Sequence, residues 1–239
     1  MDWINNNNRP VIFLGSNGAL WHLHDVCKRC GVTVHGLIDN DYFGNTESLD
    51  GIRVLDTEYV FDDPEKLAYY KDNFNFFLVV NVTGQRDPVH MRNADKRQKF
   101  IDLIEKFNLN CISLIDPSSV VHETNKIGKN VLIDAFSYVS AFNVIGDFTH
   151  IYAYAAIGHH NNIGKNCFIQ RQAGIHINNT LEDNVYVGLS TQVFADGITL
   201  SKGTVIHPCL AVNRSTVENE TVSLAGKDLR RIYPYIQEA

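Results

Sequence analysis

The C-terminal half of this chain carries an aliphatic residue at every sixth position from 115 to 193 without a gap. Six residues of an α-helix turn the side chain by about 240°, so a helix would scatter these residues around its surface. A coil with three short flat sides would return them all to its interior, and three hexads make one such 18-residue coil. The spacing therefore predicts a hexapeptide-repeat parallel β-helix. The series is Ile115, Val121, Ile127, Ile133, Val139, Ile145, Ile151, Ile157, Ile163, Ile169, Ile175, Leu181, Val187 and Val193.

A single coil cannot bury its own interior, so the coils are expected to stack and share one apolar column. Strands of neighbouring coils then lie about 4.8 Å apart, and residues 18 apart in sequence become neighbours in space. After Val193 the series slips by one residue before Leu200, Ile206 and Val212 resume it, which predicts a bulge or a small loop.

Corner segments recur at the same 18-residue interval. Glycine and asparagine are expected at these corners because both tolerate positive φ angles. The corners are Ile127-Gly128-Lys129-Asn130, Ile145-Gly146-Asp147-Phe148, Ile163-Gly164-Lys165-Asn166 and Leu181-Glu182-Asp183-Asn184.

Residues 10–113 follow a different pattern, in which short apolar strands alternate with helical stretches. This alternation predicts a small parallel sheet of the α/β class. The chain is therefore divided into an α/β domain (1–113), a β-helix domain (114–226) and a C-terminal tail (227–239). The expected elements are strands at 11–14, 32–38 and 76–80, a helix ending near Cys30, and a helix whose apolar face holds Phe100, Leu103, Ile104 and Phe107.

Charge and composition narrow the classes of partner. The net charge of −6 over 239 residues argues against nucleic acid as the main partner. No apolar run approaches the length of a membrane span, and the N-terminus lacks the pattern of a signal peptide, so a cytoplasmic location is expected. Cys27 and Cys30 form a lone C-x-x-C with no second pair. They are interpreted as free thiols, and no metal is expected.

Four segments carry a resemblance to a known family: VIFLGSNG at 11–18, GLIDND at 36–41, VIGDFTH at 144–150 and IGKNCFI at 163–169. They resemble the hexapeptide-repeat sugar acetyltransferases related to sialic acid O-acetyltransferase and to the N-acetyltransferases of nucleotide-linked amino sugars. The resemblance covers nearly the whole chain. It implies a Rossmann-like N-terminal domain, a left-handed β-helix, and a homotrimer with acetyl-CoA between subunits.

The resemblance also implies that the N-terminal domain holds the nucleotide part of a sugar substrate. The turn formed by Gly15, Ser16, Asn17 and Gly18 offers backbone N–H groups to phosphate oxygens. Asp39 follows the second strand, where a carboxylate accepts hydrogen bonds from a base or a ribose. The alternative is a tight strand–helix turn that binds no ligand.

The general base of the family is missing from its usual place. Ala141 stands where the resemblance implies a catalytic histidine, and Phe142 stands where its acidic neighbour should be. One coil later, at the same position, lies His159, followed by His160. Either the base has shifted by one coil, to His159 or secondarily His160, or the reaction proceeds without one. An amine nucleophile needs less help from a base than an alcohol, so Ala141 favours N-acylation.

Three further residues are assigned by the resemblance. His150 matches a histidine near the acyl donor, against the alternative of a surface corner residue. Gly226 and Lys227 belong to the closing turn that passes the CoA groove, where Lys227 either contacts a phosphate or is simply solvated. His176 and His207 are interpreted as residues of the coil surface.

The predicted function is acetyl-CoA-dependent N-acetylation of a nucleotide-linked amino sugar, with acetyl-CoA as the acyl-donor substrate. Two alternatives remain: O-acetylation of a sugar, and a non-catalytic protein that binds sugar nucleotides or acts as a scaffold.

Overall fold

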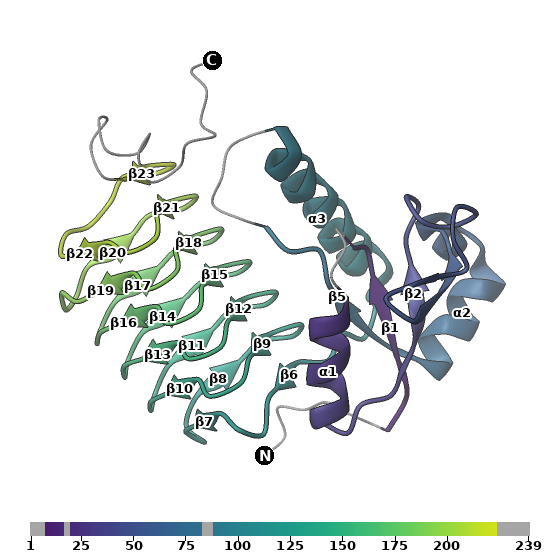
Figure 1. Ribbon diagram of the computed structural model, residues 1–239, viewed down its shortest axis with the longest axis horizontal. Coiled ribbons are helices and arrows are strands. Elements are labelled where there is room, and N and C mark those ends of the chain that lie inside the picture. The colour runs from purple at the N-terminus through teal and green to yellow at the C-terminus, as the bar shows by residue number, and fades with distance from the viewer. Residues whose placement is uncertain (1–7, 17–19, 83–87, 224–239) are drawn as a thin grey trace.

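The computed structural model describes residues 8–16, 20–82 and 88–223. An α/β unit lies beside a stack of coils, and the two are arranged side by side along the longest axis of the molecule (Figure 1).

The α/β unit is built on a five-stranded sheet with the order β3-β4-β2-β1-β5. All of its strand pairs are parallel except β3 with β4. The strands are β1 (Val11–Leu14), β2 (Val34–Ile38), β3 (Ser48–Leu49), β4 (Ile52–Asp56) and β5 (Asn75–Leu78), and the helices are α1 (Trp21–Arg29), η1 (Glu58–Asp62, a 3₁₀ helix), α2 (Pro64–Asn73) and α3 (Pro88–Phe107).

Both faces of this sheet are covered, which explains the continuous apolar runs in its central strands. Val11 and Phe13 of β1 pack with Leu23 of α1 and with side chains of the β-helix. Ile12 and Leu14 point to the opposite face, which packs against α3. The sheet is therefore sandwiched between α3 on one side and α1 with the β-helix on the other.

The coils form a three-sided prism in which every strand pairs in parallel with a strand one coil away. We name its sides by strand number. The seven-strand face holds β6 (Leu114–Ile115), β9 (Leu132–Ile133), β12 (His150–Ile151), β15 (Phe168–Ile169), β18 (Tyr186–Val187), β21 (Val205–Ile206) and β23 (Thr221–Val222). The six-strand face holds β7 (Val120–Val121), β10 (Tyr138–Val139), β13 (Ala156–Ile157), β16 (Gly174–Ile175), β19 (Gln192–Val193) and β22 (Ala211–Val212). The five-strand face holds β8 (Lys126–Ile127), β11 (Val144–Ile145), β14 (Asn162–Ile163), β17 (Thr180–Leu181) and β20 (Thr199–Leu200).

The predicted register is confirmed. Tyr138 pairs with Ala156 and Val139 with Ile157, in each case 18 residues apart. The aliphatic series forms one continuous core inside the prism. The slip after Val193 is also confirmed, because Val193 pairs with Val212, 19 residues along. The stacked parallel strands fit the left-handed β-helix that the resemblance implies.

The corner prediction is right for asparagine and wrong for glycine. Asn130, Asn166 and Asn184 have positive φ angles, as do aromatic residues at equivalent positions such as Phe148. Gly128, Gly146 and Gly164 do not. A Cβ atom on Gly146 would lie 2.6 Å from the backbone carbonyl carbon of Gly164, one coil away. Glycine is required there because neighbouring coils approach closely, and not because of its backbone freedom.

A ladder of buried asparagines runs up the inside of one corner. The Oδ1 atoms of Asn125, Asn143 and Asn161 each accept a hydrogen bond from the backbone N–H of the asparagine 18 residues later, at 2.8–2.9 Å. The ladder reaches Asn179, whose Oδ1 accepts from Ile198 at 3.0 Å. It links four successive coils through side-chain to backbone hydrogen bonds that supplement those between the strands.

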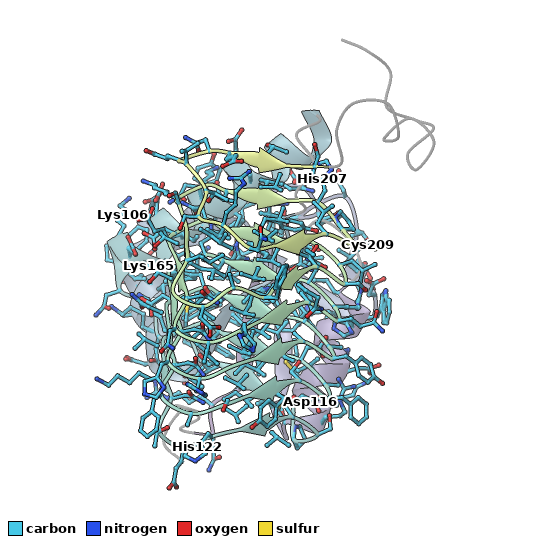
Figure 2. The ribbon with its side chains drawn as sticks, turned by 90° about the vertical axis from the view of Figure 1, so that its left-hand side faces the viewer. Lys106, Asp116, His122, Lys165, His207 and Cys209 are labelled. Carbon is cyan, nitrogen blue, oxygen red and sulfur yellow. The ribbon has the colours of Figure 1, made fainter. Side chains whose placement is uncertain are left out.

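The seven-strand face is the side on which the α/β unit packs. Leu132, Tyr152 and Phe168 share an apolar cluster with α1 and the central strands of the sheet. Arg29 of α1 also donates to Asp116 of the β-helix at 2.5 Å. Near the end of α3, the Nζ of Lys165 in the β-helix lies 3.9 Å from a carboxylate oxygen of Glu105 in the helix, and Lys165 and Lys106 lie on the same side of the view in Figure 2.

Within the described ranges, no helix combines the length and the apolar character needed to cross a bilayer.

Candidate functional site

A cavity of about 480 Å³ opens at the carboxyl ends of β1 and β2. In open sheets with parallel strands, ligands commonly bind at this edge. Ser16 and Asp39 follow the ends of β1 and β2, Glu58 is the first residue of η1, and α3 supplies Lys96 and Lys99. The cavity therefore combines carboxylates and amines, and we call it the strand-end pocket.

Lys96 and Asp39 form the centre of this pocket. The Nζ of Lys96 donates to both carboxylate oxygens of Asp39, at 3.0 and 2.8 Å, and to Asp41 at 2.6 Å. The same amine donates to the carbonyl oxygen of Ser16 at 2.7 Å. Asp39 is fully buried. Burial raises the pKa of the Asp39 carboxyl group, although the hydrogen bond from Lys96 acts in the opposite direction.

The turn after β1 requires a glycine at position 15. Gly15 has a φ of 65°, and a Cβ atom there would lie 2.6 Å from both Phe100 and Val80. Any larger side chain would therefore be strained and would collide with α3. Ser16 follows as a buried residue that lines the pocket. Asn17 and Gly18, the other predicted residues of this turn, lie outside the described residues.

The predicted catalytic histidines lie on the corner between the six-strand and five-strand faces. His159 and His160 are both exposed, and their Nδ1 atoms are 2.9 Å apart. The ring of His160 packs on Phe142, one coil earlier, with centroids 4.9 Å apart. The backbone N–H of His160 donates to the carbonyl oxygen of Ala141 at 3.1 Å. The two histidines are therefore next to the position of the missing base, as the 18-residue spacing predicts.

A second cavity, of about 270 Å³, lies on the six-strand face. We call it the face groove. Small residues make its floor, including Ala156, Gly158 and Gly174, and Tyr138 and His176 are among its walls. Neither His159 nor His160 is among its lining residues. His176 pairs through Nδ1 with the carboxylate of Asp196.

His150 is fully buried between the β-helix and the α/β unit. Its ring stacks on Phe77 of β5, with centroids 5.8 Å apart, and its Nε2 lies 3.5 Å from Arg97. The alternative of a surface corner residue does not describe it. The side chain is enclosed by protein, and its assignment near the acyl donor stays a prediction.

Arg97 is a buried cation that joins the two parts of the molecule. It donates to the carbonyl oxygens of Val80 and Phe148 at 2.6 and 2.7 Å, and to Oδ1 of Asn166 at 2.7 Å. Burial lowers the pKa of Arg97 to about 9. Its guanidinium also lies over the ring of Phe168, 4.8 Å from the centroid. The side chain of Arg97 thus donates hydrogen bonds both to the segment after β5 and to two successive coils of the β-helix.

We expect the buried His150 to make stability depend on pH. Burial and the nearby charge of Arg97 lower the pKa of His150 well below 6.5. Below about pH 6.5, His150 binds a proton in the unfolded chain but stays neutral in the folded chain. The free energy of unfolding therefore falls as the pH drops. The slope approaches about 1.4 kcal/mol per pH unit for this one group. Urea denaturation between about pH 4.5 and 7.5 measures it.

The matched variant is His150→Phe, which keeps a ring at this position but cannot titrate. Below about pH 6.5, its free energy of unfolding should fall with decreasing pH less steeply than that of the wild-type protein, by about 1.4 kcal/mol per pH unit. This difference in slope does not depend on the stability of the variant at neutral pH. Equal slopes in the two proteins would show that folding does not lower the pKa of His150.

The remaining predicted residues, Gly226 and Lys227, fall outside the described part of the chain. Reasoning from sequence missed Lys96, Arg97 and Asp196. A signal existed for the first two, because Lys96 and Arg97 lie four residues before Phe100 and Ile101 and so continue the buried side of α3. Asp196 carried no such signal, because its partner depends on the shape of one irregular corner.

Three solved structures share this fold over nearly the whole chain. A mutant of perosamine N-acetyltransferase from Caulobacter crescentus, in complex with CoA and GDP-perosamine, matches with a TM-score of 0.74 at 19% identity, covering 89% of this chain and 92% of that chain. The acetyltransferase domain of PglB from Neisseria gonorrhoeae matches with a TM-score of 0.74 at 15% identity, covering 90% and 96%. WeeI from Acinetobacter baumannii matches with a TM-score of 0.71 at 19% identity, covering 89% and 96%. No family model and no curated protein matches the sequence. At these identities the likeness establishes the fold.

Proposed function

We propose that this protein transfers an acetyl group from acetyl-CoA to the amine of a nucleotide-linked sugar. The observation that carries the proposal is the strand-end pocket, in which Asp39, Lys96 and the Gly15 turn converge at the sheet edge where nucleotides bind in α/β folds. The same chain supplies a β-helix that packs on the α/β unit through its seven-strand face.

The solved structures support this proposal. The perosamine enzyme is in complex with CoA and GDP-perosamine, and the PglB and WeeI structures align over a similar span. We therefore assign the α/β unit as a Rossmann-like domain for the nucleotide, with Ser16 and Asp39 as contacts. The turn residues Asn17 and Gly18 would offer their N–H groups to phosphate oxygens. The N–H of Gly15 donates to the carbonyl oxygen of Ile38 at 3.0 Å, so the part of Gly15 in this proposal is to shape the turn.

In this proposal acetyl transfer takes place on the β-helix. His159 and His160 are the proton acceptors proposed from the sequence, and Gly226 and Lys227 contribute to CoA binding. An amine that is bound neutral is already a good nucleophile, so positioning and oxyanion stabilisation supply much of the rate. The loss of the usual base at Ala141 is therefore compatible with N-acetylation and would slow an alcohol acceptor more.

We further propose that the protein is a homotrimer. Large apolar side chains are exposed on the six-strand face and its two corners, and a face of this kind is typical of protein interfaces. All the described residues that line the strand-end pocket belong to the α/β unit, and all those that line the cavity on the six-strand face belong to the β-helix. In a trimer, a substrate held in the pocket of one copy would meet the six-strand face of its neighbour. The exposed side chains are Val120, Phe136, Tyr138, Phe142, Tyr154 and Phe194.

Release of the CoA thiol from acetyl-CoA, measured with a panel of amino-sugar nucleotides, tests the function directly. Turnover with amine acceptors supports the proposal. Turnover only with hydroxyl acceptors would make the protein a sugar O-acetyltransferase. Binding of nucleotide sugars without turnover of any acceptor would support the alternative of a non-catalytic protein that binds sugar nucleotides.

Asp39→Asn is expected to weaken binding of a nucleoside diphosphate such as GDP or UDP by about 10-fold or more. The substitution removes the charge and one acceptor from a buried group, and a hydrogen bond to a charged group contributes about 1.5–3 kcal/mol. Calorimetric titration measures the change. Asp62→Asn is the control, because Asp62 is exposed, pairs with Lys106 and lies outside the strand-end pocket. An unchanged dissociation constant in Asp39→Asn would remove this residue from the site.

A further inference from the structure

We propose that His176, held by Asp196, is the general base of the acetyl transfer, and that the face groove is where the thioester meets the acceptor. This inference rests on the proposed function and deepens it. It replaces His159 and His160 in that role with a residue that the sequence pattern alone assigned to the coil surface.

The first argument is the partner of each imidazole. An ionised carboxylate can only accept hydrogen bonds, so the Nδ1 of His176 carries the proton that it shares with Asp196. The Nε2 of a neutral His176 is then an acceptor, which is the form a base needs, and the carboxylate stabilises the imidazolium that results. His159 instead faces the Nδ1 of His160 at 2.9 Å. The imidazole of His160 carries no negative charge that would stabilise a protonated His159.

The second argument is access to a cavity. His176 lines the face groove together with Tyr138, Ala156 and Gly174. Ala156 adds only a methyl group to the floor, and Gly174 adds no side chain and leaves room for the side chain of Gln192, whose Oε1 would collide with a Cβ atom at that position. Gly158 has to remain a glycine, since a Cβ atom there would lie 2.6 Å from the backbone carbonyl oxygen of His176. The ring therefore borders a cavity of about 270 Å³ on the six-strand face, and the described residues that line it all belong to the β-helix.

The third argument is the irregular corner that places Asp196 beside His176. In the regular repeat, the residue 18 positions after His176 is Phe194, which also lines the groove. The extra residue between Val193 and Leu200 lengthens the next corner, and Gly197 turns it with a φ of 70°. This longer corner brings the carboxylate of Asp196 to Nδ1, 20 residues from the histidine. The first break in the hexad series thus coincides with the histidine–carboxylate pair.

The proposed step balances as follows. The neutral nitrogen of the acceptor amine forms a bond to the carbonyl carbon of the thioester, and its proton passes to Nε2 of His176. The C–S bond then breaks, the new amide keeps the acetyl group, and the sulfur of CoA leaves with the proton that Nε2 returns. His176 ends the cycle neutral, so no further reactant is required.

The chain offers a matched control. His122 lies three coils before His176, at the same position of the hexad, because 54 residues separate them. It is exposed near the end of the stack that holds the first coils (Figure 2). Its Nδ1 lies 3.0 Å from the hydroxyl of Thr124, and it is not a lining residue of the face groove.

The decisive experiment measures thiol release by the wild-type protein and by His176→Ala, His159→Ala, Asp196→Asn and His122→Ala. We expect His176→Ala to lower kcat by about 10²-fold or more, Asp196→Asn by about 10-fold or more, and His122→Ala to leave it unchanged. Added imidazole should restore part of the rate of His176→Ala, which a merely structural defect would not allow. A full rate in His176→Ala, or a large loss confined to His159→Ala, overturns the inference while the acetyltransferase function stands.

A second measurement separates this inference from the function itself. Histidine modification by diethyl pyrocarbonate is followed by mass spectrometry with and without saturating CoA. Protection of His176, with His122 modified equally in both samples, places the acyl donor at the face groove even if no acceptor is turned over. Equal modification of His176 in both samples overturns the inference, whether or not the wild-type protein is active.

Discussion

Arg97→Ala is expected to lower the free energy of unfolding by about 4 kcal/mol or more, the largest effect of any substitution proposed for this protein. The guanidinium is fully buried and satisfies the carbonyl oxygens of Val80 and Phe148 and the amide oxygen of Asn166. A buried acceptor left without a donor costs about 1–3 kcal/mol, and alanine would leave two buried carbonyl oxygens and the half-buried amide oxygen of Asn166 without this donor, together with a cavity.

The measurement is urea denaturation at neutral pH, with Lys106→Ala as the control on the same helix. Lys106 is exposed and its pair with Asp62 spans 3.4 Å, so its loss should change stability by less than about 0.5 kcal/mol. Arg97→Lys is informative as well, because one ammonium group cannot reproduce the planar fork that reaches three acceptors. A loss below about 1 kcal/mol in Arg97→Ala would mean that the buried charge costs nearly as much as its hydrogen bonds contribute.

Arg97 also carries a functional expectation. Its neighbour Lys96 holds Asp39, and Phe100 one turn later borders the Gly15 turn. A variant that loosens α3 from the coils should therefore weaken nucleotide binding along with stability. This coupling would appear in the same calorimetric titration proposed for Asp39→Asn.

Asn161→Ala is expected to destabilise the protein by about 3 kcal/mol. The side chain is buried in the middle of the asparagine ladder. Its Oδ1 accepts from the backbone N–H of Asn179 at 2.9 Å, and its Nδ2 donates to the carbonyl oxygens of Gly158 and His176 at 3.0 and 2.8 Å. Alanine leaves all three groups without these partners in the interior of a corner.

The adjacent residue provides the control for this prediction. Asn162 lies on β14 with its side chain exposed on the five-strand face, so Asn162→Ala should change stability by less than about 0.5 kcal/mol. Thermal or urea denaturation of both variants measures the contrast. Similar values for the two variants would show that the ladder adds little to the hydrogen bonds between strands. A further loss of acetyl transfer in Asn161→Ala would fit the contact of its amide with His176.

The β-helix could be read from sequence because its core follows a strict period. Burial of one residue in six is dictated by the geometry of a single coil, so the pattern specifies both register and faces. The ladder was equally periodic, at 125, 143, 161 and 179, yet the asparagines were not recognised as a structural series. The prediction for the corner glycines is wrong because the space between coils, and not a positive φ angle, requires glycine there.

The α/β unit was predicted less completely, for physical reasons. The strand at Ile52–Asp56 lies toward the edge of the sheet, next to the short β3, and two of its five residues are buried, which weakens its apolar signal. The helix at Pro64–Asn73 has no buried residue, so it shows no amphipathic pattern to recognise. The polar contacts of the candidate sites, such as Lys96 with Asp39, join segments far apart in sequence. No local pattern specifies these pairs.

The asparagine ladder stops at Asn179, whose Nδ2 has no hydrogen-bond partner among the described residues. Above it the next rung is the backbone N–H of Ile198. Side-chain links between the later coils include hydroxyl groups, since Thr191 donates to the carbonyl oxygen of His207 and Ser201 to that of Thr216, both at 2.8 Å. The inserted corner therefore ends the amide series without ending the side-chain links between coils. Asp196 lies in that corner, so the carboxylate that holds His176 belongs to the point at which the regular repeat ends.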